Sequence, residues 1–184
     1  MSWVLLLLDV DGVISPMAPP GSHGGSWPEA SWEIAPVGGM LGTEYSTEMI
    51  GQLRRIASLP GVDGAWCTTW GPMAPKRLAP VIGLGRRWPA LEPGPHESHF
   101  CGPGWWKAAR AREEVARHDA VVWVDDLIDP WREALDDAGL AGPESWPGGR
   151  LLAVSPAPDE GLSPQDLAEI GAFVRHALRA NEGV

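Results

Sequence analysis

The first apolar stretch of the chain ends in two aspartates that are separated by a single residue. The run at positions 4–8 contains no polar side chain and is followed by Asp9, Asp11 and Gly12. A continuous apolar run closed by a turn signal predicts a strand that is buried on both faces. Side chains two residues apart point the same way, so Asp9 and Asp11 should project together from the carboxyl end of the strand. Because a plain Asp-Gly turn needs only one of these aspartates, the pair predicts a ligand site.

Two carboxylates this close repel each other unless a cation or a bound proton separates their roles. One of them can then act as an ionised nucleophile beside a metal ion, while the other donates a proton. This division of roles suits phosphoryl transfer, in which a carboxylate must approach a phosphate dianion that repels it. A site of this kind also requires other oxygen ligands for the metal ion and a compensating positive charge.

Two later strands are also predicted to end in polar residues. The strand expected at 62–68 ends at Thr68 and Thr69, and the strand expected at 120–126 ends at Asp125 and Asp126. Neighbouring parallel strands would bring these ends to one edge of the sheet, where carboxylates could hold Mg²⁺ and hydroxyl groups could bind phosphate. Lys107, in the first turn of a helix predicted at 105–118, could stabilise the developing charge.

In this order, the segments resemble the four motifs of the haloacid dehalogenase (HAD) superfamily of aspartate-nucleophile phosphohydrolases. The segments that carry the resemblance are Asp9-Val10-Asp11-Gly12-Val13, Ala65-Trp66-Cys67-Thr68-Thr69-Trp70, Trp106-Lys107 and Trp123-Val124-Asp125-Asp126-Leu127-Ile128-Asp129. The tryptophan-flanked motifs and the late Gly161-Leu162-Ser163 are also similar to the HAD-like domain of Swiss Army Knife RNA-repair proteins.

The resemblance implies a role for each motif residue. Asp9 would attack phosphorus to form an aspartyl-phosphate, while Asp11 would protonate the leaving oxygen and then activate water. The Mg²⁺ ion would be held by Asp9, the Asp11 backbone carbonyl and Asp125, with Asp126 as a further candidate ligand.

The resemblance leaves other candidate positions open. Thr68 would bind phosphate, assisted by Lys107 and by Thr69, although Thr69 would face elsewhere if Thr68 is in place. Lys76, in a proline-flanked loop, is a less suitable alternative to Lys107, and Asp129 is either a metal ligand, an orienting group or a helix cap.

The alternation of predicted strands and helices implies an α/β fold with right-handed crossovers. The resemblance specifies the HAD-like Rossmannoid three-layer fold, with a mainly parallel central sheet. We expect a single domain over 1–184, with a flap or loop insertion at 15–45 and an irregular region at 71–104. Neither insertion looks long or regular enough for a cap domain, which leaves the site open.

These observations predict a Mg²⁺-dependent phosphomonoesterase that acts on a phosphorylated small molecule or a nucleic-acid end. The alternatives are a nucleic-acid end-healing phosphatase, in which Lys76-Arg77 or Arg86-Arg87 would contact the backbone, and a non-catalytic HAD scaffold that binds phosphate or protein. A scaffold has no need of the motif carboxylates and Lys107. An acid at Asp11 suits a phosphate ester better than a halide leaving group, which argues against a dehalogenase.

Composition restricts the setting of this chemistry. The 184 residues carry a formal charge of −10, which argues against general binding to nucleic acids or anionic membranes. The chain has two cysteines, and its N-terminus resembles neither a signal peptide nor a membrane span, so we expect a reduced cytoplasmic protein. The 11 tryptophans suit core packing, with base stacking by Trp27, Trp70, Trp88 or Trp105 as the alternative. The spacing of His96, His99 and Cys101 matches no zinc site, so that segment is read as a loop.

Overall fold

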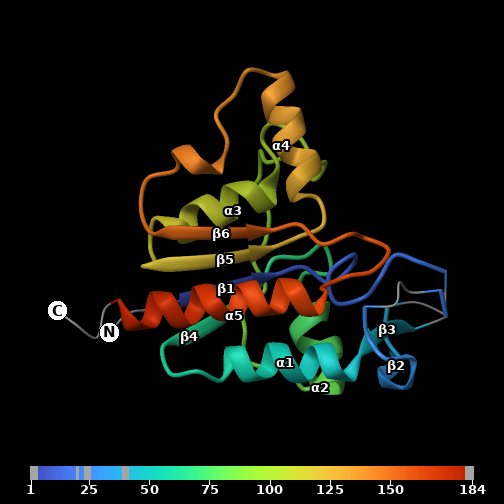
Figure 1. The fold of residues 1–184 in the computed structure, drawn as a ribbon. Helices are drawn as coiled ribbons and strands as arrows, with labels where there is room; N and C mark the ends of the chain where they lie inside the picture. Colours follow the sequence, from blue (N-terminus) through green and yellow to red (C-terminus); the bar gives the residue numbers. More distant parts are fainter. Residues whose placement is uncertain (1–3, 20, 23–25, 39–41, 181–184) are drawn as a thin grey trace.

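The computed structural model describes residues 4–19, 21–22, 26–38 and 42–180. Its central sheet contains four parallel strands in the order β4–β1–β5–β6 (Figure 1). The strands are β1 (Val4–Leu8), β4 (Val62–Trp66), β5 (Ala120–Val124) and β6 (Arg150–Val154). Every residue of β1 and β5 is buried, as the uninterrupted apolar runs predict. The mainly parallel sheet is thereby confirmed.

Helices cover both faces of the sheet and complete three layers (Figure 1). Leu6 and Leu8 of β1 pack with α1 (Thr47–Ala57) and α5 (Pro164–Arg179), and Leu5 and Leu7 pack on the opposite face with α3 (Trp106–Val115) and α4 (Ile128–Asp137). Alternate residues of one strand therefore supply two separate hydrophobic cores, which is the expected result of the two-residue side-chain period. The prediction of a three-layer Rossmannoid arrangement is confirmed.

Side-chain caps begin the two helices on the first of these faces. The Ser46 hydroxyl accepts a hydrogen bond from the Met49 amide at 3.2 Å, and Ser163 forms a reciprocal capping box with Asp166. These bonds satisfy amides that have no partner within the helix. Both helices therefore begin at a serine whose side chain caps the first turn.

A two-stranded antiparallel hairpin follows β1 in the chain. It pairs β2 (Trp32–Ala35) with β3 (Thr43–Ser46), after a short 3₁₀ helix at Glu29–Ser31. The carboxyl ends of the sheet strands point toward the side of the molecule on which this hairpin lies (Figure 1). This hairpin lies within the flap or loop insertion expected at 15–45, and Gly39 lies outside the described residues. We refer to residues 32–46 as the flap.

The segment 71–104 contains more regular structure than its sequence predicts. A π-helical turn at Ala74–Leu78 runs into the short helix α2 (Ala79–Ile82), and a single bridge joins Ala90 to Trp66 at the end of β4. Pro75 and Pro80 stand in the first turn of these helical pieces, where a missing amide proton is tolerated. Within the described residues, neither this segment nor the flap forms a cap domain.

Tryptophan side chains make up much of the core under α3 and α4. Four of them, Trp105, Trp123, Trp131 and Trp146, contact one another with ring centroids 5.5–6.3 Å apart. The packing interpretation of the high tryptophan content is therefore confirmed for this group. No helix of the described chain has the length and the apolar character that crossing a bilayer requires.

Candidate active site

The backbone ladders of the sheet extend one residue past the strands and align the polar strand ends. The Asp9 amide donates to the Val124 carbonyl at 3.1 Å, the Cys67 amide to Leu8 at 2.8 Å, and the Asp125 amide to Val154 at 3.2 Å. The predicted site residues of three strands therefore begin at the same edge of the sheet.

Lys107 joins two of these strand ends. Its Nζ donates one hydrogen bond to Asp9 Oδ2 and a second, of 2.7 Å, to Asp125 Oδ2. Only 2% of the lysine is exposed. Burial by itself would lower the pKa of Lys107, but the charges of Asp9 and Asp125 outweigh it and raise the pKa, so the ammonium stays charged. The alternative lysine, Lys76, is exposed on the π-helical turn.

Lys107 packs against the tryptophan core. The Lys107 Nζ lies 5.5 Å from the centre of the Trp105 ring, and Trp105 packs against Trp123 of β5. Because Trp105 immediately precedes α3, the same core places the start of this helix and the ammonium at its first turn. The contact adds a favourable cation–π interaction to the two ion pairs.

Asp9, Asp125 and Asp126 form a compact group of carboxylates. One oxygen from each lies within 4.8 Å of the others, and all three side chains are almost fully buried. The pKa values of Asp125 and Asp126 are raised, first by burial and then by the charge of Asp9. With Lys107 included, three carboxylates face one ammonium, so the ionised group carries two excess negative charges.

This group has the donor chemistry of a magnesium site. Each carboxylate oxygen of Asp9 and Asp125 accepts one hydrogen bond. The donors are Lys107 to both residues, the Val10 amide to Asp9 and the Leu127 amide to Asp125. A carboxylate oxygen offers two acceptor positions, so further coordination remains available. Carboxylates are the ligands that Mg²⁺ prefers, and a divalent cation would balance the excess charge.

The absence of a side chain at Gly12 leaves room for the Asp126 carboxylate beside Asp9 and Asp125. The glycine adopts a φ of +69°, and a Cβ atom at this position would lie 2.5 Å from the Asp126 Cγ. Any larger residue would therefore meet both backbone strain and a direct clash with the carboxylate. This contact explains physically why a glycine follows Asp11 at the end of β1.

The Asp11 carboxylate stands beside the carboxylate group and outside it. Its Oδ2 accepts a hydrogen bond from the Trp70 indole Nε1 at 2.8 Å. Burial raises the pKa of Asp11, and the Trp70 hydrogen bond counteracts part of this shift. Among the predicted metal ligands, Asp11 is thus the one whose side chain does not join the group, and its predicted contribution through the backbone carbonyl stays a prediction.

The two threonines are arranged differently from the strand-based expectation. Thr69 is exposed and lines the same cavity as Asp9 and Asp11, whereas Thr68 is 1% exposed and lines an adjacent pocket of about 340 Å³. The strand ends at Trp66, and the Gly71 amide closes a turn on the Thr68 carbonyl at 3.1 Å. Side-chain alternation does not continue through a turn, which is why register alone misplaces Thr69.

The cavity at the strand ends has a volume of about 490 Å³. Asp9, Asp11, Asp126, Lys107 and Thr69 form its polar wall, and Met17, Leu127, Pro158 and Asp159 complete the lining. The Met17 amide donates to the Pro158 carbonyl at 2.7 Å, so two loops far apart in sequence share this rim. Sequence reasoning missed these rim residues because no local pattern marks a contact between separate loops.

Residues 5–167 match the HAD domain in Swiss Army Knife RNA repair proteins. The chain belongs to this family. Curated proteins and solved structures gave no match. Membership of the HAD superfamily agrees with the resemblance of the four motifs, with the parallel sheet and with the edge of the sheet at which the acidic residues meet.

Asp129 lies outside the carboxylate group of the HAD site. Helix α4 begins at Ile128, which places Asp129 inside its first turn and not at its cap. The exposed carboxylate pairs with Arg132 at 3.1 Å. The helix-cap interpretation is therefore wrong. Asp129 is not part of the carboxylate group, and its role as a metal ligand or an orienting group stays a prediction.

Two of the four tryptophans considered for base stacking are inaccessible. Trp27 is 5% exposed and donates its indole proton to the Leu162 carbonyl, and Trp105 is 1% exposed. Trp88 packs over Gly64 in a separate pocket that also contains Arg87. Trp70 contacts Asp11, and the buried Trp105 contacts Lys107 from within the core.

The remaining titratable side chains of the predicted motifs do not form a second centre. No other three His, Cys, Asp or Glu side chains of the described residues approach closely enough to hold a metal. Burial raises the pKa of the Cys67 thiol, which agrees with core packing. The loop interpretation of the segment that contains His96 and His99 therefore agrees with the structure.

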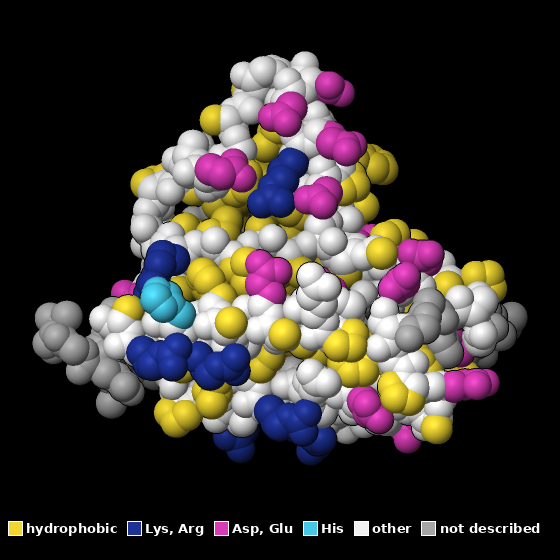
Figure 2. Space-filling model, viewed as in Figure 1, with side chains coloured by type: hydrophobic (Ala, Val, Ile, Leu, Met, Phe, Trp, Pro, Cys, Tyr) yellow, Lys and Arg dark blue, Asp and Glu magenta, His cyan; other side chains and the backbone are white. Residues whose placement is uncertain are grey.

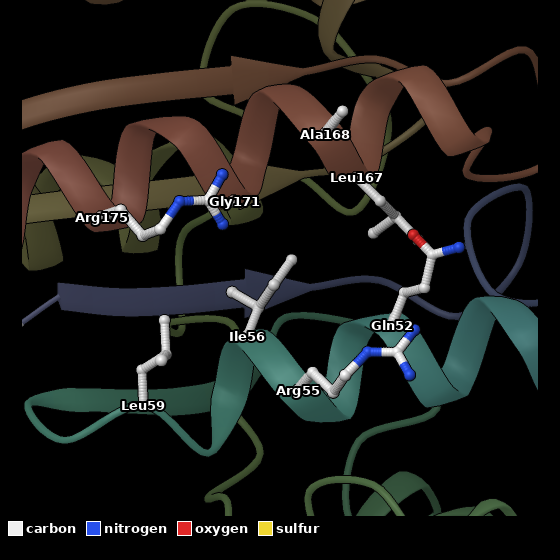
Figure 3. A pocket seen from close by; sticks show the side chains of 8 residues that line it. All are labelled: Gln52, Arg55, Ile56, Leu59, Leu167, Ala168, Gly171 and Arg175. Carbon is white, nitrogen blue, oxygen red and sulfur yellow. The ribbon is translucent and has the colours of Figure 1, made fainter.

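A groove between α1 and α5 carries positive charge on this otherwise acidic protein. Figure 2 shows Lys and Arg side chains gathered over α1 and the C-terminal half of α5. The groove encloses about 330 Å³, with Arg55 on α1 and Arg175 along α5 (Figure 3). Ile56, Leu59 and Leu167 supply its apolar lining. Within the described chain, neither guanidinium forms an ion pair.

Proposed function

We propose that this HAD domain is a Mg²⁺-dependent phosphomonoester hydrolase that uses Asp9 as its nucleophile. The arrangement of Asp9 carries the proposal, because this buried carboxylate contacts the Lys107 ammonium, adjoins two further carboxylates and opens into the cavity. Burying four charges has a large desolvation cost that a purely structural role does not require. This cost argues against the alternative of a non-catalytic scaffold.

The proposed reaction proceeds in two steps at Asp9. A carboxylate oxygen of Asp9 attacks phosphorus, the bond to the leaving oxygen breaks, and Asp11 donates its proton to that oxygen. Water then attacks the aspartyl-phosphate and gives a proton to Asp11, which releases phosphate and restores both carboxyl groups. Lys107 stabilises the charge that develops on the phosphoryl oxygens, and the Thr69 hydroxyl binds one of these oxygens.

Asp9, Asp125 and Asp126 would hold the metal ion. When bound, Mg²⁺ would reduce the repulsion between the phosphate dianion and Asp9 and would stabilise the charge of the transition state. The apolar side chains of Met17, Leu127 and Pro158 would contact the organic part of the ester. A cavity of about 490 Å³ lies in the range of small-molecule sites, which supports a small phosphomonoester as substrate.

A phosphatase screen of the purified protein in Mg²⁺ tests the proposal. The substrates are p-nitrophenyl phosphate, alkyl phosphates, nucleotides, and oligonucleotides with a 3′- or 5′-phosphate. We expect release of inorganic phosphate from at least one of these phosphomonoesters. If none of these substrates is hydrolysed, the phosphatase proposal is contradicted and the interpretation as a non-catalytic scaffold is favoured.

Replacing Lys107 with methionine should lower kcat by roughly 10²–10³-fold, the usual effect of removing one electrostatic donor from a transition state. Methionine retains an unbranched side chain but leaves Asp9 and Asp125 without their shared cation. Removing one partner from a buried ion pair costs about 3–5 kcal/mol, so thermal unfolding should also shift downward. Steady-state kinetics and calorimetry measure both effects, with K76M as the exposed control. An unchanged kcat would remove Lys107 from the mechanism.

A nucleic-acid end is the second candidate substrate. The family match to RNA repair proteins favours it, as does the groove in which Arg55 and Arg175 form no ion pair with any described residue. The stretch of α5 from Leu167 to Arg175 covers about 12 Å, at 1.5 Å per residue. The start of α5 is tied to the loop after Asp11, because the Leu162 amide donates to the Val13 carbonyl at 2.9 Å. A strand whose end occupies the cavity could thus follow α5 toward the two arginines.

If this candidate is correct, a phosphorylated oligonucleotide should have a higher kcat/KM than its mononucleotide, because Arg55 and Arg175 would contact backbone phosphates that the mononucleotide lacks. The double variant R55E/R175E should lose this preference and retain mononucleotide turnover. R112E, on the opposite face at α3, is the matched charge control. The salt dependence should be shallow because few cations take part. Equal kcat/KM values for the two substrates would contradict the nucleic-acid candidate and favour a phosphatase that acts on small molecules.

A further inference from the structure

The Trp70 indole makes a directional contact with the acid/base residue of the proposed mechanism. Its Nε1 donates to Asp11 Oδ2 at 2.8 Å, and no other side chain of the described residues forms a hydrogen bond with this carboxylate. An indole N–H can only donate, so it always meets an acceptor lone pair on Oδ2. The other oxygen, Oδ1, thereby remains available to exchange a proton with the leaving group or with water.

The flap holds the Trp70 ring from its other side. A Cβ atom at Gly38 would lie 2.4 Å from the Trp70 Cη2 atom and 2.5 Å from the Thr43 Oγ1 atom. Thr43 in turn donates to the Val37 carbonyl at 2.7 Å, which joins the two sides of the flap beside Gly38. The backbone of the flap therefore approaches the indole so closely that only glycine fits between them. The ring lies between this turn and Asp11.

The backbone of Trp70 is fixed as well. Its amide donates to the Thr68 Oγ1 at 3.3 Å, within the turn that follows β4. The indole is thus constrained by the strand end on one side and by the flap on the other. A side chain constrained in this way can hold a carboxylate in one orientation at little additional entropic cost.

We infer that Trp70 is a positioning residue, which orients Asp11 for proton transfer and couples its orientation to the flap. This inference rests on the proposed function, because it assigns Asp11 the proton exchange described above. Trp70 itself forms and breaks no bond in the reaction. Its contribution should therefore appear only in steps that need a correctly placed proton.

The variant W70F tests this role because phenylalanine retains an aromatic ring and lacks the N–H donor. The value of kcat/KM for an alkyl phosphate, whose leaving oxygen needs a proton, should fall about tenfold or more. This loss is part of the roughly 10²–10⁴-fold that general acid–base catalysis supplies. The value for p-nitrophenyl phosphate, whose leaving group needs no proton, should change less than about threefold. W88F, which removes a half-buried indole outside the site, should leave both values unchanged.

A variant of Asp11 separates failure of this inference from failure of the mechanism. If D11N lacks the same leaving-group dependence, the acid role of Asp11 is wrong. If D11N has this dependence and W70F does not, the positioning role of Trp70 is overturned. In the double variant D11N/W70F, the second substitution should cause no further loss, because both residues act through one proton transfer.

The flap provides an independent route to the same conclusion. G38A introduces a methyl group against the indole while leaving Trp70 and Asp11 in the sequence, so it should reproduce the selective loss on alkyl phosphates. Near-ultraviolet circular dichroism verifies that the variants are folded. Equal losses on alkyl and nitrophenyl phosphates in a folded G38A protein would contradict the coupling between the flap and Asp11.

Discussion

Replacing Asp9 with asparagine should abolish turnover of every phosphomonoester, with a loss on the order of 10⁴-fold or more. Asparagine has nearly the same shape and can still accept the hydrogen bond that the Val10 amide donates to Oδ1 at 2.7 Å. It lacks the negative charge and the nucleophilic oxygen that the attack on phosphorus requires. No aspartyl-phosphate should therefore form, whatever the leaving group of the substrate.

Two measurements examine this loss separately. Steady-state kinetics with p-nitrophenyl phosphate report turnover, and intact-protein mass spectrometry after rapid acid quench reports the covalent phosphate. The control is D129N, which makes the same chemical change at an exposed aspartate on α4, outside the carboxylate group. The fold should persist in D9N, because Lys107 retains its 2.7 Å hydrogen bond to Asp125. Normal turnover of p-nitrophenyl phosphate by D9N would disprove the nucleophile assignment.

Removal of the divalent cation should have a similarly large effect. Asp9, Asp125 and Asp126 face the single ammonium of Lys107, and an incoming phosphate dianion would add further negative charge to this buried space. Without a cation, the approach of phosphate to Asp9 is electrostatically unfavourable. Excess EDTA should therefore abolish turnover, and added Mg²⁺ should restore it.

Thermal stability gives a measure of metal binding that does not depend on catalysis. A ligand that binds only the folded state stabilises it by about 2.7 kcal/mol at 100 times its Kd, so Mg²⁺ should raise the melting temperature. D126N removes one of the three carboxylates and should require a higher Mg²⁺ concentration for the same shift. D129N should respond as the unmodified protein does. Full activity in excess EDTA would rule out the metal assignment.

Apolar patterning alone was sufficient to predict the sheet, the helices that cover it and the edge at which the chemistry lies. Fully apolar runs such as 4–8 can only be buried on both faces, and this requirement specifies a parallel sheet between two helical layers. Asp9 and Asp125 follow such strands directly, so the position of each is set by the strand before it. Lys107 could be predicted for a related reason, because it stands in the first turn of a regular helix.

The contacts between side chains beyond the strand ends could not be predicted in this way, because they depend on how the folded chain brings separate loops together. The hydrogen bond from Trp70 to Asp11 joins residues 59 positions apart, and each lies in a turn that no periodic pattern describes. For the same reason, the positions of Thr69 and Met17 in the cavity wall could not be predicted. Strand register would direct Thr69 away from the cavity, and Met17 lies in a separate loop. The burial of Trp27 and Trp105 likewise depends on which elements pack over them. Apolar periodicity records the burial of a segment, whereas the contacts between separate loops depend on how the whole chain is packed.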